Sequence, residues 1–233
     1  MGTNFLTAEW KHLAMVNFAI EPSALRSFVP AGVELDAWNG RTYVSMVGFR
    51  FLNTRVRGIA IPFHRNFEEI NLRFYVRRKD GNDWKRGVVF VKEIVPRAAI
   101  AFVARTLYNE PYVALPTRHT VNQDNAEYAW RFDGRWNSLR VTPTGSPGPS
   151  AAGSEAEFIT EHYWGYSRQK DGGTKEYRVD HPRWNVRPAS DAAIDIDVAA
   201  LYGEAFVEPL VQRPTSAFLA EGSEVTVSEG ILL

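Results

Sequence analysis

The 233-residue chain contains no cysteine. This absence excludes disulfide bonds, a thiolate nucleophile, and zinc or iron–sulfur sites that depend on cysteine ligands. Long apolar runs are also absent, since the longest obvious one, at 98–104, is seven residues and far shorter than a membrane span. Charged and polar side chains interrupt residues 1–20, unlike the apolar stretch of a secretory signal. We therefore expect a cytoplasmic protein with no membrane partner.

A net charge of one sign is missing too, because 27 basic residues balance 27 acidic residues. The balance conceals a division: residues 1–120 carry 17 basic and 10 acidic side chains, whereas residues 121–233 carry 10 basic and 17 acidic ones. A nucleic-acid-binding domain usually has a net basic surface, so nucleic acid is not an expected partner. If both halves contribute strands to one domain, arginine–carboxylate pairs should join them.

Recognisable cofactor and metal motifs are absent from the sequence. It has no glycine-rich phosphate-binding loop and no serine in a nucleophile-elbow pattern. None of the five histidines pairs with another at the four-residue spacing of a helical metal site. We therefore expect neither a metal nor a cofactor.

Short β-strand patterns separated by turn residues run along most of the chain. The strongest is Asn39-Gly40 between the runs 35–38 and 41–51, which predicts a hairpin with a type I′ turn. A final hairpin is expected to pair 217–220 with 225–228. The segment 98–108, which begins after one proline and ends before another, predicts the main helix.

About a dozen strands, one main helix and a few short helices predict a mainly β (α+β) protein built as a single antiparallel β-barrel. We expect one domain over residues 1–233. Residues 143–150 are rich in proline, glycine and serine, so we expect a mobile loop over 143–153.

The segment 69–76 alternates strictly between polar and apolar side chains, so Glu69, Asn71, Arg73 and Tyr75 share one strand face. The simpler interpretation is that this face is exposed to solvent. The functional interpretation is that it lines the interior of the barrel, where a carboxylate beside an arginine can bind and polarise a small acid or carbonyl compound. The burial of Glu69 decides between them.

Two weaker candidate sites contain histidine. His162, Trp164, Tyr166 and Arg168 share one face if 162–168 is a strand, and they form either a surface aromatic ladder or a ligand contact. His64 lies in a loop beside a proline, and such loops often carry function, but a structural histidine fits this position equally well.

Several stretches resemble a known family. They are 64–73, Gly87-Val88-Val89-Phe90, and the segment from Ala104-Arg105 to Asn109-Glu110-Pro111-Tyr112. These residues resemble the YqjF-like family of uncharacterised bacterial proteins, over residues 10–227 approximately. That family is similar to the acetoacetate decarboxylase-like superfamily, whose cone-shaped antiparallel barrel holds the active site in its cavity. The resemblance implies the same barrel here.

The resemblance also bears on mechanism. In acetoacetate decarboxylases, a glutamate works with a lysine that forms a Schiff base. The resemblance places Glu69 at the glutamate and Tyr112 at the lysine. A tyrosine cannot form an imine with a keto acid. The resemblance therefore implies a barrel with a cavity but without the classical acetoacetate decarboxylase reaction.

The resulting hypothesis is a small-molecule-binding barrel that acts on a small carboxylate or carbonyl compound. If it is an enzyme, its chemistry is lyase- or isomerase-like, with Glu69 as the acid/base and Arg73 as an anion clamp. The expected substrate-binding residues are Arg73, Asn71, Tyr112, His64, His162 and Trp164. The alternatives are a noncatalytic ligand sensor or carrier, and a structural module that forms a homo-oligomer through its aromatic residues.

Overall fold

The computed structural model describes residues 4–233, which form a mainly β protein with short helices. The strands are β1 (Asn4–Ile20), β2 (Glu34–Leu35), β3 (Thr42–Val56), β4 (Phe67–Asp80), β5 (Asp83–Val95), β6 (Tyr112–Ala114), β7 (Thr117–Val121), β8 (Ala126–Phe132), β9 (Arg135–Pro143), β10 (Gly148–Pro149), β11 (Trp164–Arg168), β12 (Thr174–Asp180), β13 (Asn185–Asp195), β14 (Ser216–Ser228) and β15 (Ile231–Leu232). The helices are α1 (Pro22–Leu25), α2 (Ala98–Tyr108), α3 (Glu155–Thr160), α4 (Val198–Tyr202), the 3-10 helix η1 (Glu204–Phe206) and α5 (Val207–Val211).

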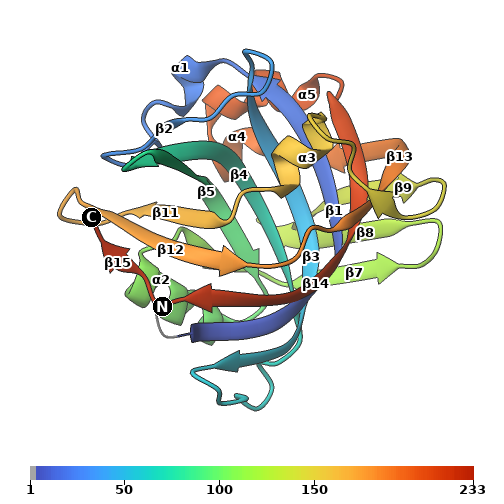
Figure 1. Ribbon diagram of the computed structural model, residues 1–233. Helices are drawn as coiled ribbons and strands as arrows, with labels where there is room; N and C mark the ends of the chain where they lie inside the picture. Colours follow the sequence, from blue (N-terminus) through green and yellow to red (C-terminus); the bar gives the residue numbers. More distant parts are fainter. Residues whose placement is uncertain (1–3) are drawn as a thin grey trace.

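Seven strands close into a ring through their hydrogen bonds (Figure 1). The order is β1, β3, β4, β5, β11, β12 and β14, and β14 pairs with both β12 and β1. Neighbouring strands are antiparallel except β5 and β11, which run parallel over a short register. The all-antiparallel arrangement expected from the sequence is wrong at this pair, because the chain returns to β5 by a long crossover that includes α2. The mainly β class is confirmed.

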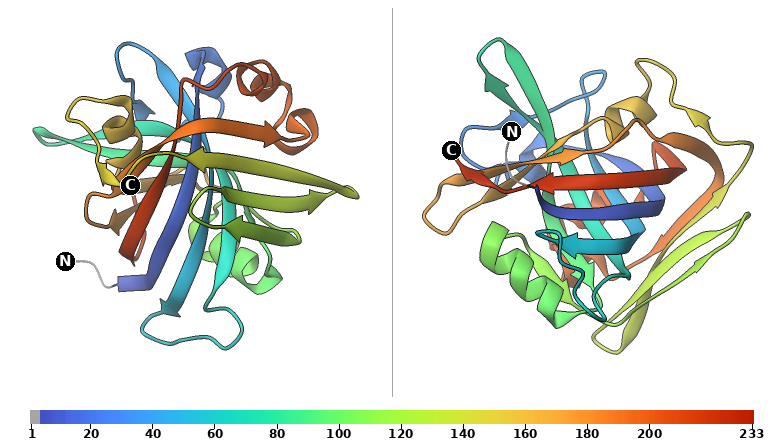
Figure 2. Two further views of the ribbon diagram at one scale, coloured as in Figure 1. Left: turned by 90° about the vertical axis from the view of Figure 1, so that its right-hand side faces the viewer. Right: turned by 60° about the horizontal axis from the view of Figure 1, so that its bottom comes forward.

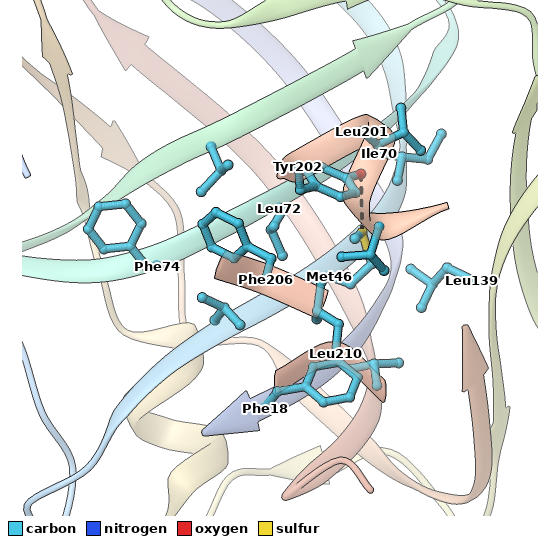
Figure 3. Close-up of a cluster of buried hydrophobic side chains, with 14 of the residues drawn as sticks. Phe18, Met46, Ile70, Leu72, Phe74, Leu139, Leu201, Tyr202, Phe206 and Leu210 are labelled. Carbon is cyan, nitrogen blue, oxygen red and sulfur yellow. Dashed lines mark hydrogen bonds between the residues drawn. The ribbon is translucent and has the colours of Figure 1, made fainter. Parts of the chain in front are cut away.

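A second layer covers one face of the ring. Strand β13 pairs with β14 and continues the sheet through β9, β8 and β7, the yellow-green strands of Figure 2. Together with α4, η1 and α5, these strands pack on the outward face of β1, β3 and β4. Figure 3 shows part of this core, in which Met46, Leu72 and Phe74 from the strands belong to the same buried cluster as Phe206 and Leu210 from the helices. The central strands are therefore buried on both faces, which decides the environment of Glu69.

The Asn39-Gly40 turn has the positive φ angles of 49° and 76° that the sequence predicts. The expected hairpin beyond it is wrong, however, because only the single bridge Trp38↔Arg41 joins its two arms. The preceding segment pairs instead with β4, through β2 and through a bond from the Asp36 amide to the Tyr75 carbonyl (2.9 Å). Strand β4 therefore takes up the backbone N–H and C=O groups of the first arm that a longer hairpin would need.

The final hairpin, expected between 217–220 and 225–228, is also wrong. These residues belong to the continuous strand β14, which pairs with β1 along most of its length. Gly222 has a φ of +77° and lies opposite Lys11, next to a second residue with positive φ, His12 (57°). The glycine therefore accommodates an irregularity in a long strand pair rather than a reversal of the chain.

The main helix is confirmed as α2 at 98–108, whereas α4, η1 and α5 were not expected. Within the predicted mobile loop 143–153, Gly148 and Pro149 pair with β13; the mobility of this loop stays a prediction. No helix within residues 4–233 is long and apolar enough to cross a membrane.

The two oppositely charged halves of the sequence both contribute to the ring, but their strands do not interleave: β1, β3, β4 and β5 from the first half form one arc, and β11, β12 and β14 from the second half form the other. Arginine–carboxylate pairs between the halves are correspondingly few among residues 4–233. Arg57–Glu229 and Arg78–Glu176 join them, but most arginine pairs stay within one half. The expected pairing between halves is mostly wrong, because the nearest carboxylates lie on the same strand, as for Arg78–Asp80, or on a strand of the same half, as for Arg140 on β9 and Asp191 on β13.

Phe74 gives a direct test of this core. Its side chain is fully buried in the layer outside the ring. Replacing Phe74 by alanine is expected to lower the free energy of unfolding by about 3–5 kcal/mol, because it removes buried apolar contacts and leaves a cavity. Urea unfolding measures this. The matched control is Phe63→Ala, where the ring is 88% exposed and little change is expected. An equal loss in both variants would contradict the packing described here.

Candidate functional site

The interior of the ring contains a cavity of about 250 Å³. All seven ring strands contribute to its wall, which is largely apolar and aromatic. The candidate acid/base and all the expected substrate-binding residues line this cavity: Glu69, Asn71, Arg73, Tyr112, His64, His162 and Trp164. The tertiary structure thus brings together one strand face, two histidine segments and a residue that follows the main helix.

The polar face of β4 is buried. The exposed fractions are 2% for Glu69, 1% for Asn71 and 8% for Arg73. This excludes the interpretation of a solvent-facing strand. The alternating pattern is real, but its apolar side packs against the second layer and its polar side faces the cavity.

Glu69 is held by two side-chain donors. The Tyr112 hydroxyl donates to Oε2 (2.8 Å), and the Asn71 amide Nδ2 donates to Oε1 (3.0 Å). Burial raises the pKa of Glu69 to about 7, although these two hydrogen bonds and the positive charge of Arg73 act in the opposite direction. A carboxyl group that titrates near neutral pH can both accept and return a proton, as general acid/base catalysis requires.

Two further buried glutamates face the cavity and were not expected from the sequence. Glu93 on β5 lies opposite Asn71 on β4 and next to Tyr112 on β6. Glu110 accepts a hydrogen bond from the Tyr177 hydroxyl at 2.7 Å. Burial raises the pKa of Glu110 to about 8, and burial together with the neighbouring carboxylates raises the pKa of Glu93 well above its usual value. Glu110 therefore holds its proton at neutral pH.

The only available signal for these glutamates was a single acidic residue within the apolar run 86–95, and another directly before Pro111. Nothing local distinguishes either from a solvent-exposed carboxylate. Their proximity to Glu69 depends on the pairing of β4 with β5 and of β5 with β6, which is a long-range property.

Arg73 is a buried cation with little compensation. One terminal nitrogen donates a long hydrogen bond to the Ile159 carbonyl (3.5 Å), and Nε has no hydrogen-bond partner in the described part of the chain. Within residues 4–233 no carboxylate lies within ion-pair distance of its guanidinium. Burying a charge without a partner is costly. This guanidinium can therefore receive a carbonyl or carboxylate oxygen in the cavity.

His162 is oriented by Asp36, another residue that sequence analysis missed. Its Nε2 lies 3.1 Å from Asp36 Oδ2, which also accepts a hydrogen bond from Arg86 Nε at 2.7 Å. The imidazole packs against the rings of Tyr75 and Phe158. Burial lowers the pKa of His162 to about 4, so the ring is neutral at physiological pH.

The remaining candidates are less deeply placed. His64 lies in the connection between β3 and β4, where its Nδ1 is 2.8 Å from the Pro62 carbonyl. Trp164 is half-buried, with the Lys85 ammonium 4.2 Å from its ring centre. Arg168 is exposed and donates to the Val29 carbonyl, so it does not join the cavity.

No lysine lines the cavity in the described part of the chain. Lys92 directly precedes Glu93, but its ammonium bonds to the Leu201 carbonyl and lies over Tyr202 in the outer core. Alternation along β5 therefore directs Glu93 to the cavity and Lys92 away from it. The cavity has acid/base groups and a guanidinium, but no amine of its own.

Solved structures with the same arrangement define the class of fold. The acetoacetate decarboxylase of Legionella pneumophila has a TM-score of 0.74 and 12% identity, over 100% of this chain and 90% of that one. The enduracididine biosynthesis enzyme MppR, complexed with pyruvate, has a TM-score of 0.69 and 14% identity, over 97% of this chain and 90% of that one. The protein therefore has an acetoacetate decarboxylase-like fold.

Its family is more specific. The model of DUF2071, described as an uncharacterised conserved protein, matches residues 7–224. The protein YqjF of Bacillus subtilis (strain 168) is 30% identical over 164 residues, which is 70% of this chain and 65% of YqjF. The aligned region thus spans slightly less than two thirds of that relative. The chain belongs to the DUF2071 family, and the resemblance to YqjF is confirmed.

Proposed function

We propose that the cavity binds a small carboxylate or carbonyl compound and moves a proton on it, with Glu69 as the acid/base and Arg73 as the group that holds the ligand oxygen. One observation carries this proposal: a buried carboxyl group with a pKa near neutrality shares a cavity with a buried guanidinium that has no carboxylate partner. The names of the structural neighbours, an acetoacetate decarboxylase and an enzyme complexed with pyruvate, agree with a ligand of this class. We also infer that the ring forms the cone-shaped barrel that the sequence predicts.

The proton transfer can be written for a keto acid. Arg73 holds the carboxylate, and ionised Glu69 takes a proton from the carbon next to the carbonyl group. The electron pair of that C–H bond forms a carbon–carbon double bond, and the carbonyl electron pair moves to oxygen. A protonated neighbour, Glu93 or Glu110, stabilises this oxygen by donating a hydrogen bond. Return of a proton from Glu69 to carbon restores the keto form, so the step is an exchange or an isomerisation.

Pyruvate in D₂O provides the test. Proton NMR of the methyl signal is expected to show faster deuterium exchange with the protein than without it. Stabilisation of the fold by pyruvate without exchange would instead indicate a noncatalytic carrier. If pyruvate causes neither deuterium exchange nor stabilisation of the fold, the proposal is contradicted for this keto acid.

Schiff-base chemistry is expected to be absent. Treatment of the protein with pyruvate and sodium cyanoborohydride should leave no single lysine preferentially alkylated, because no lysine lines the cavity among the described residues. Intact-mass measurement and peptide mapping check this, with an amine-free buffer and a sample lacking pyruvate as controls. Stoichiometric modification of Lys92, the lysine nearest in sequence to Glu93, would show that the cavity rearranges to use it.

A further inference from the structure

Among residues 4–233, two buried oxygen atoms next to Glu69 have no hydrogen-bond partner. They are Oδ1 of Asn71 and Oε2 of Glu93, on residues that are 1% and 2% exposed. The two residues lie opposite each other across β4 and β5, and both line the cavity. Leaving such acceptors unpaired away from water is costly, so their arrangement indicates a ligand that supplies N–H or O–H donors.

The orientation of the Asn71 amide supports this interpretation. Its Nδ2 donates to Glu69 Oε1, and both oxygens of Glu69 are already engaged, one by Asn71 and one by Tyr112. Reversing the amide would bring its oxygen against a carboxylate oxygen, so the bond to Glu69 keeps Oδ1 as the free acceptor. Asn71 Oδ1 is therefore a vacant acceptor, and Glu93 Oε2 becomes a second one when Glu93 is ionised, whereas Arg73 Nε is a vacant donor.

The buried carboxyl groups of the cavity also favour a ligand with a cationic group. Three buried carboxyl groups, Glu69, Glu93 and Glu110, face the cavity together with the Arg73 guanidinium and the imidazoles of His64, His162 and His181. A cationic group in the ligand would allow a second carboxylate to ionise without a large Coulomb penalty. Within residues 4–233, no group of three metal-ligating side chains has an arrangement that could hold a metal ion. An organic ammonium group fits these acceptors better.

We propose that the ligand of this cavity carries a primary amine, whose ammonium group donates to Asn71 Oδ1 and Glu93 Oε2 while its carbonyl or carboxylate group is held by Arg73. This inference rests on the proposed function and narrows its substrate class to amino acids or amino ketones. The body of the ligand is apolar, because the wall around the polar groups is formed by side chains such as Trp10, Phe49 and Phe90.

Three probes with the same phenyl ring separate the contributions of the head group: 2-phenylethylamine, 2-phenylethanol and 3-phenylpropionate. Titration calorimetry at pH 7 is expected to show the amine binding at least about tenfold more tightly than the alcohol, as charge-assisted hydrogen bonds provide. Repeating the titration in buffers with different ionisation enthalpies should show the release of up to one proton on amine binding and none on alcohol binding, because the ammonium favours the ionised carboxylate.

Variants locate the amine within the cavity. Glu93→Gln and Asn71→Leu should each remove the advantage of the amine over the alcohol while alcohol binding remains, which also shows that the variant is folded. The matched control is Glu68→Gln, because Glu68 precedes Glu69 on the same strand but bonds to Thr117 and His119 outside the cavity. This control should keep the advantage of the amine.

The outcomes distinguish this inference from the proposed function. An amine that binds no more tightly than the alcohol, or an advantage that survives both Glu93→Gln and Asn71→Leu, overturns the amine site. If 3-phenylpropionate then binds and Arg73→Met abolishes that binding, the proposed function stands without an amine. Failure of all three probes to bind overturns both proposals for ligands with an apolar body.

Discussion

Replacing Glu69 by glutamine is expected to slow the exchange of pyruvate methyl protons by a factor of about 10²–10⁴, the usual contribution of a positioned general acid/base. Glutamine has nearly the same shape, and its oxygen can accept from Asn71 while its amide nitrogen donates to the Tyr112 hydroxyl oxygen, but it cannot take a proton. The exchange rate is followed by NMR at pH 7, close to the pKa of the carboxyl group.

The control for this substitution is again Glu68→Gln. It removes a carboxylate from the adjacent position of β4, but on the opposite face of the strand. We expect exchange to continue at nearly the wild-type rate. Equal loss of exchange in both variants would indicate damage to the strand, and unchanged exchange in Glu69→Gln would remove Glu69 from the mechanism. Pyruvate-dependent thermal stabilisation, measured for each variant, separates loss of binding from loss of proton transfer.

The stability of the protein is expected to fall as pH rises through the range in which the buried carboxyl groups ionise. Burial raises the pKa of Glu110 from 4.5 to about 8 in the folded state. Above pH 4.5 the unfolded chain releases this proton while the folded chain retains it, so the free energy of unfolding decreases until about pH 8. Since each pKa unit corresponds to about 1.4 kcal/mol, the whole change is on the order of 5 kcal/mol.

Other groups with shifted pKa values also change the stability of the fold in this pH range, so their contributions must be separated from that of Glu110. Glu69 and Glu93 face it with raised pKa values and the same sign, and Tyr177 bonds to it. His162 has the opposite effect: its folded pKa of about 4 lies below its ordinary value of 6.5, so it destabilises the fold as pH falls between these values. The total stability should therefore decrease from pH 4.5 to about 8, with part of the decrease below pH 6.5 offset by His162.

Comparison of wild type with Glu110→Gln isolates one contribution. Urea unfolding at several pH values between 4.5 and 8 should show the variant gaining stability relative to wild type as pH rises, because glutamine has no proton to lose. Glu204→Gln is the control, since Glu204 is exposed at the start of η1, and the difference from wild type should not depend on pH. A Glu110→Gln difference that stays constant with pH would contradict the raised pKa of Glu110.

Several features of the fold and of the site follow from the sequence alone. The alternation over 69–76 was enough to predict that Glu69, Asn71 and Arg73 share one strand face, because side chains on a strand alternate by simple geometry. The prolines around 98–108 delimited α2, and Asn39-Gly40 located a turn. The absence of cysteine, and Tyr112 at the position of the lysine in the family resemblance, already argued against thiolate and Schiff-base chemistry.

Strand pairing was not accessible in the same way. The arms of the Asn39-Gly40 turn separate because β4 offers the first arm a better partner, and 216–228 remains one strand because β1 pairs with nearly all of it. Local turn residues show where a chain can reverse, but a competing long-range hydrogen-bond ladder decides whether a hairpin follows.

The sequence by itself determined which side chains share a strand face, the extent of the main helix, and the residue types available for chemistry. Only the tertiary structure decided that the polar face of β4 is buried, because a second layer covers the other face of the strand. It also decided that Glu93 and Glu110 join Glu69, and that Asp36 orients His162. Periodicity along a strand reports its two sides, whereas the solvation of each side, and with it every shifted pKa in the cavity, depends on elements far away in the sequence.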